Sequence, residues 1–350
     1  MSNKLDIKVF EPPINRRYWV VKADAGKHYE TFISNSLIAI GHFNHFAIGI
    51  DNSNPFVATS NEIKKRMTTR KEGENHVNPN NFGQVNSFVN EIKIGDWVIT
   101  KTLKHIRVGQ VTSAARVDNK VVKHTINKGQ TYEREVKLDF ILKRSVCWGP
   151  EIKMRHISAG MLNSLRSPMT LYNIDQHMGS ICYTLYPFFK INNSLHLSIK
   201  INSEEEISNY YLTKVFSYLN ELEFISQVDL GNEDLSEIYQ SFIDEGIFNL
   251  TTQASFHSPG DIWVKILFPS GQPKTNMAKA LLIYSMMFGN HQLGIDGVLD
   301  LQSRQKVWDT VIERVDMKVM KSTVEKLNLT MPKYETENIE VISDDDIHIV

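Results

Sequence analysis

The sequence contains few cysteines and no long apolar run. Only Cys147 and Cys182 occur among its 350 residues. Two widely spaced thiols provide neither a disulfide framework nor a Cys-x-x-Cys metal knuckle, and they fit a chain that works in the reducing cytoplasm. No stretch of 18 or more apolar residues is present, so we expect no transmembrane helix. The polar N-terminus, residues 1–8, also lacks the apolar core of a signal peptide.

Common catalytic motifs are absent as well. There is no P-loop, no Gly-x-Ser-x-Gly and no His-Glu-x-x-His. His42 and His45 lie three residues apart, but a metal centre needs further ligands and the sequence offers no third one beside them. We therefore expect no metal, no cofactor and no catalytic residue.

The net charge of -1 hides an uneven distribution of charge. Residues 1–200 hold 28 Lys and Arg against 16 Asp and Glu (+12), whereas residues 201–350 hold 11 against 24 (-13). A basic half attracts polyanions such as nucleic acids through counterion release. The alternatives are that the acidic half packs on the basic half, or that both are solvated surfaces.

Short strands and helices alternate in the first half, which indicates an α+β fold. The patterns predict strands over 18–23, 37–41, 97–99, 106–111, 134–143 and 169–174, helices over 28–35, 59–69, 84–92 and 159–165, and loops over 73–83 and 117–132. In the helix over 59–69, Ser60 is the expected N-cap. Residues 95–113 read as the hairpin of a small β-barrel, with a cationic turn between its strands.

The second half reads as a separate, mainly helical α+β domain with one β-hairpin. Ser203, followed by Glu204–Glu206, predicts the N-cap and acidic first turn of a helix. The remaining predictions are helices over 234–245, 277–288 and 300–327, and a hairpin of 248–256 with 262–268 around a turn at 257–261.

Several short segments of the first half occur in a familiar order. They are Tyr18-Trp-Val-Val-Lys-Ala, Ala25-Gly26, Ile38-Ala-Ile-Gly41, Ile94-Gly-Asp-Trp97, Arg107-Val-Gly-Gln-Val111, Met161-Leu-Asn-Ser-Leu-Arg166 and Met169-Thr-Leu-Tyr172. Together, over residues 16–176, they resemble the PUA-like (EVE-like) domain at the N-terminus of Mrr-type restriction-system proteins. The resemblance implies a small β-barrel with flanking helices that binds nucleic acid in bacterial anti-phage or restriction systems, often through a pocket for one modified or flipped-out base.

A flipped base needs aromatic walls and a few polar groups that read its edge. The residues expected to form the base pocket are Trp19, Lys22, Gly26, His42, Phe43 and Trp97. Those expected to contact phosphates are Lys27, Lys101, Lys104 and Arg107. The sequence departs from the family where His42 and Phe43 stand, because relatives commonly carry Trp after this Ile-Gly, so the ligand itself stays open.

The expected organisation has five parts. They are an extended lead-in (1–15), a PUA-like domain (16–176), a linker (177–202), an acidic domain for oligomerisation or effector recruitment (203–330) and a disordered acidic tail (331–350). The leading hypothesis is a protein that binds nucleic acid, DNA rather than RNA, or a modified nucleotide.

Two other functions stay open. One is a divalent-metal nuclease, although Glu-x-Lys triplets begin at Glu62, Glu91, Glu135 and Glu151 and are too frequent to be specific. Its carboxylates would include Asp296 and Asp300 of the acidic half. The other is an interaction protein whose acidic half masks the basic half.

Overall fold

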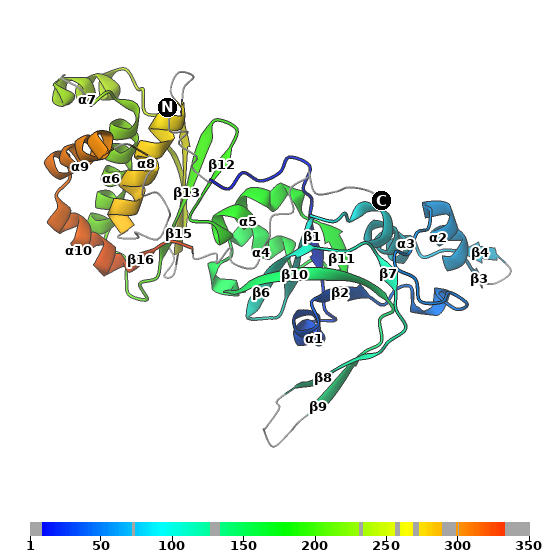
Figure 1. The fold of residues 1–350 in the computed structure, drawn as a ribbon. Helices are drawn as coiled ribbons and strands as arrows, with labels where there is room; N and C mark the ends of the chain where they lie inside the picture. The colour runs from blue at the N-terminus through cyan, green and yellow to red at the C-terminus, as the bar shows by residue number, and fades with distance from the viewer. Residues whose placement is uncertain are drawn as a thin grey trace. The chain divides into compact units, whose positions relative to one another are not determined.

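The computed structural model describes residues 9–71, 74–126, 134–230, 234–255, 260–268, 273–288, 299 and 301–332. They form two compact units, one of residues 13–180 and one that joins residues 9–12 to residues 181–332 (Figure 1). The fold is mixed α+β, as expected. In the part of the chain that is described, no helix is both long and apolar enough to cross a membrane.

The unit of residues 13–180 is built on a sheet that curls into a half-barrel. Its strands are β1 (Tyr18–Val21), β2 (Leu37–Ile40), β5 (Trp97–Lys101), β6 (His105–Val111), β7 (Arg116–Val117), β10 (Leu142–Lys153) and β11 (Leu171–Asn173). Their order is β11-β1-β5-β6-β10-β2, with β7 on β10. The pair β1–β5 is parallel and the neighbouring pairs are antiparallel. The expected hairpin is confirmed as β5–β6.

Helices cover both faces of this sheet. They are α1 (Tyr29–Ser34), α2 (Ser60–Met67), α3 (Pro79–Asn86), the π-helix η2 (Ser87–Glu91) and α4 (Ala159–Ser164). Trp19 and Val98 point to one face, where they join a core with Phe32 and Phe88. On the opposite face the Tyr172 hydroxyl donates to the Ser164 carbonyl at the end of α4.

Buried Arg144 of β10 holds the π-helix in place. Its guanidinium donates to the carbonyls of Phe88 (2.8 Å), Val89 (3.1 Å) and Ser113 (3.0 Å). Burial lowers the pKa of Arg144 to about 10, which leaves the side chain protonated at neutral pH. One cation therefore satisfies three carbonyls from two separate segments.

Four local expectations in this unit are wrong. The strand expected over 134–143 is interrupted at residues 139–141, which belong to no strand. The 73–83 stretch contains β4 (Glu74–His76), which pairs with β3 (Thr69–Lys71), and the start of α3, where the Asn78 side chain caps the helix. The 117–132 connection contains β8 (Val122–Ile126), which pairs with β9 (Arg134–Leu138) in a ribbon that projects from the sheet (Figure 1). The N-cap of α2 is Thr59, which forms a capping box with Glu62, and not Ser60.

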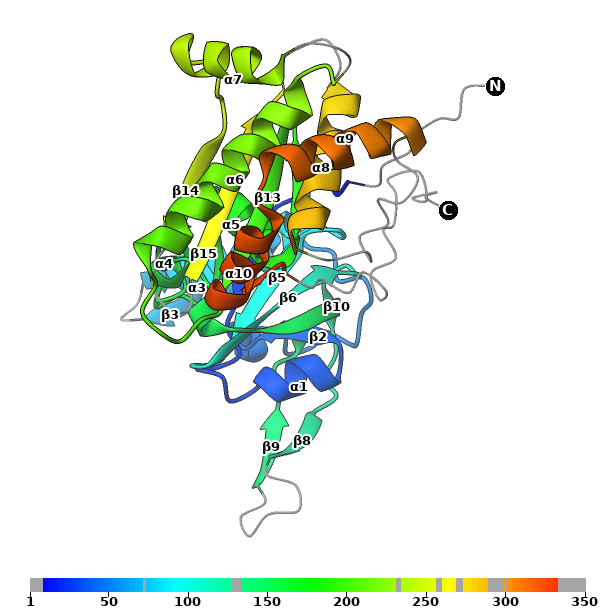
Figure 2. The same ribbon diagram turned by 90° about the vertical axis from the view of Figure 1, so that its left-hand side faces the viewer.

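The second unit has a five-stranded antiparallel sheet with helices on one face (Figure 2). The strands are β12 (Phe188–Ile191), β13 (Ser194–Ile201), β14 (Thr251–Ser255), β15 (Gly260–Leu267) and β16 (Leu329–Thr330). The helices are α6 (Asn209–Gln227), α7 (Leu235–Asp244), α8 (Pro273–Phe288), α9 (Leu301–Arg314) and α10 (Met317–Leu327). Leu195 and Leu197 of β13 point into the helical core, whereas His196 faces Tyr183 and Phe189.

The structure corrects three expectations for the second half. The segment 177–202 is no linker, because it contains α5 (Met178–Leu185), β12 and the central strand β13. Ser203 is not an N-cap, since α6 begins at Asn209. The long helix expected over 300–327 is broken at Asp316, whose carboxylate caps α10.

The hairpin of the second half is confirmed as β14–β15. Most of its turn at 257–261, together with Asp296, Asp300 and most of the 331–350 tail, lies outside the described residues.

We expect Arg144→Ala to lower the free energy of unfolding by about 3 kcal/mol, because three buried carbonyls lose their donor. Urea unfolding of the full chain measures the change. Lys65→Ala, at an exposed position of α2, is the control and should stay within about 0.5 kcal/mol of the unaltered protein. Equal effects of the two substitutions would contradict this role of Arg144.

Candidate ligand pocket

A pocket of about 300 Å³ opens in the unit of residues 13–180. It lies between the sheet edge formed by β11 and β1 and the helical segment of α3 and η2. Its lining residues are Trp19, Gly83, Gln84, Asn86, Ser87, Glu91, Met169, Leu171, Tyr172 and Asn173. Small-molecule pockets span roughly 300–1,000 Å³, so this one suits a small ligand or a single group of a larger one.

Two amide side chains of the pocket, Gln84 and Asn173, accept hydrogen bonds from the backbone. The Gln84 Oε1 accepts from the backbone N–H groups of Thr170 and Leu171, both at 2.8 Å. The Asn173 Oδ1 accepts from the Asp175 N–H at 3.0 Å. The Asn173 Nδ2 has no hydrogen-bond partner among the described residues. This amide nitrogen is buried, so the lining residue Asn173 keeps one donor without a partner beneath the pocket surface.

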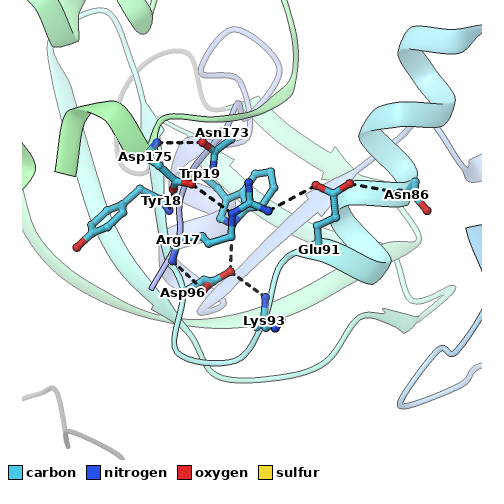
Figure 3. A network of polar contacts seen from close by, with 9 residues as sticks. All are labelled: Arg17, Tyr18, Trp19, Asn86, Glu91, Lys93, Asp96, Asn173 and Asp175. Carbon is cyan, nitrogen blue, oxygen red and sulfur yellow. Dashed lines mark hydrogen bonds and ion pairs between the residues drawn. The ribbon is translucent and has the colours of Figure 1, made fainter. Parts of the chain in front are cut away.

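The Trp19 indole is fixed by Asp96, which is 3% exposed. The Asp96 carboxylate accepts from the Trp19 Nε1 (3.1 Å) and from the backbone N–H groups of Lys93 (2.9 Å) and Arg17 (3.1 Å) (Figure 3). Gly95 precedes it with a φ of +92°, a conformation that favours glycine. The indole N–H is thus used within the protein, and the ring is held in one orientation.

Arg17 lies against this tryptophan. Its guanidinium carbon is 4.5 Å from the centre of the Trp19 ring. The same side chain pairs with Asp175 at 3.2 Å and with Glu91 at 3.7 Å (Figure 3). Because these side chains are about 40% exposed, each ion pair contributes at most about 1 kcal/mol.

The structure brings only part of the expected base pocket together. Trp19 lines the pocket. His42 is not among the lining residues. Burial lowers the pKa of His42, and its hydrogen bond with Gln84 opposes part of this effect. Phe43 is fully buried against Phe56.

Trp97 points away from this pocket. In the register of β1 with β5, Trp97 pairs with Tyr18, and Trp19 pairs with Val98. Paired residues share a face and consecutive residues alternate, so the two tryptophans project from opposite faces of the sheet. Trp97 packs against Tyr18 instead, at 5.8 Å between ring centres.

The residues that were expected to contact phosphates do not form one cluster. Lys27 pairs with Asp24 at 3.6 Å, and Arg107 donates to the Gly149 carbonyl at 3.2 Å. Lys104 is exposed in the hairpin turn.

The remaining expected residues lie near the start of that turn. Gly26 has a φ of +93°, and a Cβ at this position would lie 3.6 Å from the Cα of Thr102. Lys101, at the end of β5, lies close enough to Lys22 to affect its pKa.

The sequence does not predict Gln84, Asn86 and Asn173 as site residues. They are separated by up to 89 positions in the sequence, and they meet only because α3 packs beside β11. Only the concentration of Asn and Gln over 78–86 marks this stretch in the sequence, and such a composition by itself predicts a flexible loop followed by a helix.

No group of three or more His, Cys, Asp and Glu side chains is arranged for a metal ion within the described ranges. Asp296 and Asp300 lie outside these ranges, so the structure does not place the carboxylates of the nuclease hypothesis.

A protein-family model matches part of the chain. Residues 19–175 are similar to a domain of unknown function (DUF8426). No curated protein and no solved structure matches the chain. The matched segment contains every residue that lines the pocket.

We expect Asp96→Asn to lower the free energy of unfolding by about 2 kcal/mol, because an amide cannot accept from all three N–H groups that the carboxylate serves. The orientation of Trp19 should also change. Urea unfolding and near-ultraviolet circular dichroism measure the two effects. Glu91→Gln, which removes only an exposed ion pair, should cost less than about 1 kcal/mol. An Asp96→Asn protein as stable as this control would show that the carboxylate does not organise the site.

Proposed function

We propose that residues 13–180 form a PUA-like module that binds nucleic acid by holding one base, or a modified nucleotide, in the pocket beside Trp19. The observation that carries the proposal is the combination of a fixed indole with amide side chains in a pocket of about 300 Å³. Proteins that read an extruded or single-stranded base combine aromatic or apolar walls with hydrogen bonds to the base edge.

The polar groups of the pocket suit a base edge. Asn and Gln carry both a donor and an acceptor, as the edges of the bases do. Gln84, Asn86 and Asn173 bring three such amides to the pocket lining. Met169 and Leu171 supply apolar surface beside them.

The charge of this unit supports a polyanionic ligand. Residues 13–180 hold 24 Lys and Arg against 14 Asp and Glu, a net charge of +10. Such a charge supplies the sequence-independent part of nucleic-acid binding, which weakens as salt rises. The proposal also includes DNA rather than RNA as the ligand and an anti-phage or restriction role, both through the family resemblance. It includes a cytoplasmic location because the two cysteines are free thiols.

Filling the pocket tests the proposal. A Cβ added at Gly83 meets no atom within 4 Å, so Gly83→Phe should enter the pocket without displacing the fold. We expect it to weaken the binding of nucleic acid or nucleotide by about tenfold or more, because the added ring occupies the space of the base. The probes are DNA and RNA oligonucleotides and free nucleotides, each with and without base modification, titrated at low salt.

Gly179→Phe is the matched control, because Gly179 is also helical, has open space around its Cα and lies outside the pocket. It should retain the affinity of the unaltered protein. Absence of binding to every probe at low salt would exclude the proposed function. Cleavage of DNA in the presence of Mg²⁺ would favour the nuclease alternative, and binding only after removal of the acidic half would favour the masking alternative.

A second proposal concerns self-association of the acidic unit. Leu301, Trp308 and Ile312 of α9 are 75%, 43% and 50% exposed. Their spacing of seven and four residues places them on one side of the helix, separate from Val307 and Val311, which face the core. An exposed apolar stripe of this kind favours contact with a second copy of the chain.

The double substitution Trp308→Glu with Ile312→Glu should convert a homodimer to a monomer, because it places four carboxylates in the apolar contact. Sedimentation velocity measures the change. Gln302→Glu, on the charged side of the same helix, is the control and should leave the dimer intact. A chain that is monomeric without substitution would exclude this contact.

A further inference from the structure

Three cationic side chains lie near one another at the C-terminal ends of β1 and β5 and just after the C-terminus of α4. Lys22 and Lys101 each follow by two residues the paired positions Val20 and Ile99, so both project from the same face of the sheet. The Lys22 Nζ donates to the carbonyl of Ser167, which places it beside the turn that carries Arg166. Lys22 and Lys101 are partly buried, and Arg166 is exposed.

This cation cluster, defined as Lys22, Lys101 and Arg166, has no carboxylate partner among the described residues. Burial and Lys101 lower the pKa of Lys22, and burial and Arg166 lower the pKa of Lys101. The three positive charges therefore repel one another in the free protein. Lys27, by contrast, has Asp24 at 3.6 Å.

We propose that the cation cluster is an anion site that binds a phosphate group. The Lys22 ammonium has three donors and uses one for the Ser167 carbonyl, which leaves two for a ligand. Lys101 and the planar guanidinium of Arg166 supply further donors to phosphate oxygens. A bound phosphate would remove the repulsion between the cations, so the site gains stability when it is filled.

The cluster lies on the face of the sheet opposite Trp19, but it is close to two residues that line the pocket. Arg166 is three residues from Met169 of the pocket rim, which an extended chain spans in at most about 11 Å. The Lys22 Nζ is 5.9 Å from the centre of the Tyr172 ring, and Tyr172 also lines the pocket. This part of the inference rests on the proposed function: the cluster binds a backbone phosphate of the nucleic acid whose base enters the pocket.

The test uses the full chain with Lys101→Gln and Arg166→Gln combined. Lys64→Gln with Lys65→Gln is the matched control, because it removes two exposed positive charges of α2 from the same unit. The first arm measures thermal unfolding with and without inorganic tripolyphosphate at constant ionic strength. We expect tripolyphosphate to raise the melting temperature of the unaltered and control proteins and to have little effect on the cluster variant. Without the anion, the cluster variant should be at least as stable as the unaltered protein.

The second arm titrates a single-stranded oligonucleotide at several salt concentrations. The cluster variant should bind about tenfold more weakly than the control. The slope of log affinity against log salt should decrease by about 0.7 for each phosphate that the variant no longer neutralises.

The two arms separate the two proposals. Stabilisation by tripolyphosphate that depends on the cluster, without any oligonucleotide binding, would support the anion site and exclude the proposed function. Equal stabilisation of the unaltered protein and the cluster variant, or none of either, would exclude the anion site. Oligonucleotide binding that the cluster and control substitutions weaken equally would show that the backbone does not contact this cluster.

Discussion

The buried carboxylate of Asp96 is the interaction on which the pocket depends. A carboxylate that is almost fully buried is tolerated only when hydrogen bonds replace its hydration. Here the donors come from the start of β1, from the turn before β5 and from the Trp19 indole. The same bonds therefore fix the entry of two neighbouring strands and the orientation of the one aromatic ring that they hold beside the pocket. Arg144 performs a similar function close to Asp96, where it joins β10 to the carbonyls of the π-helix.

The pocket lies at an open sheet edge, and this position explains its composition. An edge strand exposes backbone groups that must find partners. Gln84 of α3 supplies the acceptor for two N–H groups at β11, which brings the helix close to the strand and leaves a gap lined by amides. The opposite face of the same edge carries Tyr172 and the cation cluster. In the proposed complex, the base lies on one face of this sheet edge and a phosphate lies on the other.

The second unit also contains buried polar side chains that need hydrogen-bond or ion-pair partners. Its central strand β13 is buried on both faces, with aliphatic residues toward the helices and polar residues on the other side. There His196 bonds to the Tyr183 hydroxyl at 2.7 Å, and burial lowers the pKa of His196 to about 4. Lys200 pairs with Asp261 at 2.5 Å on the same face. These contacts show that the expected linker is the centre of a sheet.

The sequence by itself determined what depends on near neighbours and on composition: the α+β class, the β5–β6 hairpin, the strand over residues 18–21 and the opposite charges of the two halves. The alternation of Leu195, Leu197 and Ile199 is also visible in the sequence, although alternation alone does not mark a central strand. Strand register and helix packing, which are long-range contacts, decided the rest. The parallel register of β1 with β5 separates Trp19 from Trp97, and the docking of α3 on β11 brings Gln84 to Asn173. No local sequence pattern predicts these contacts, because each joins residues that are far apart in the sequence and come together only in the folded chain.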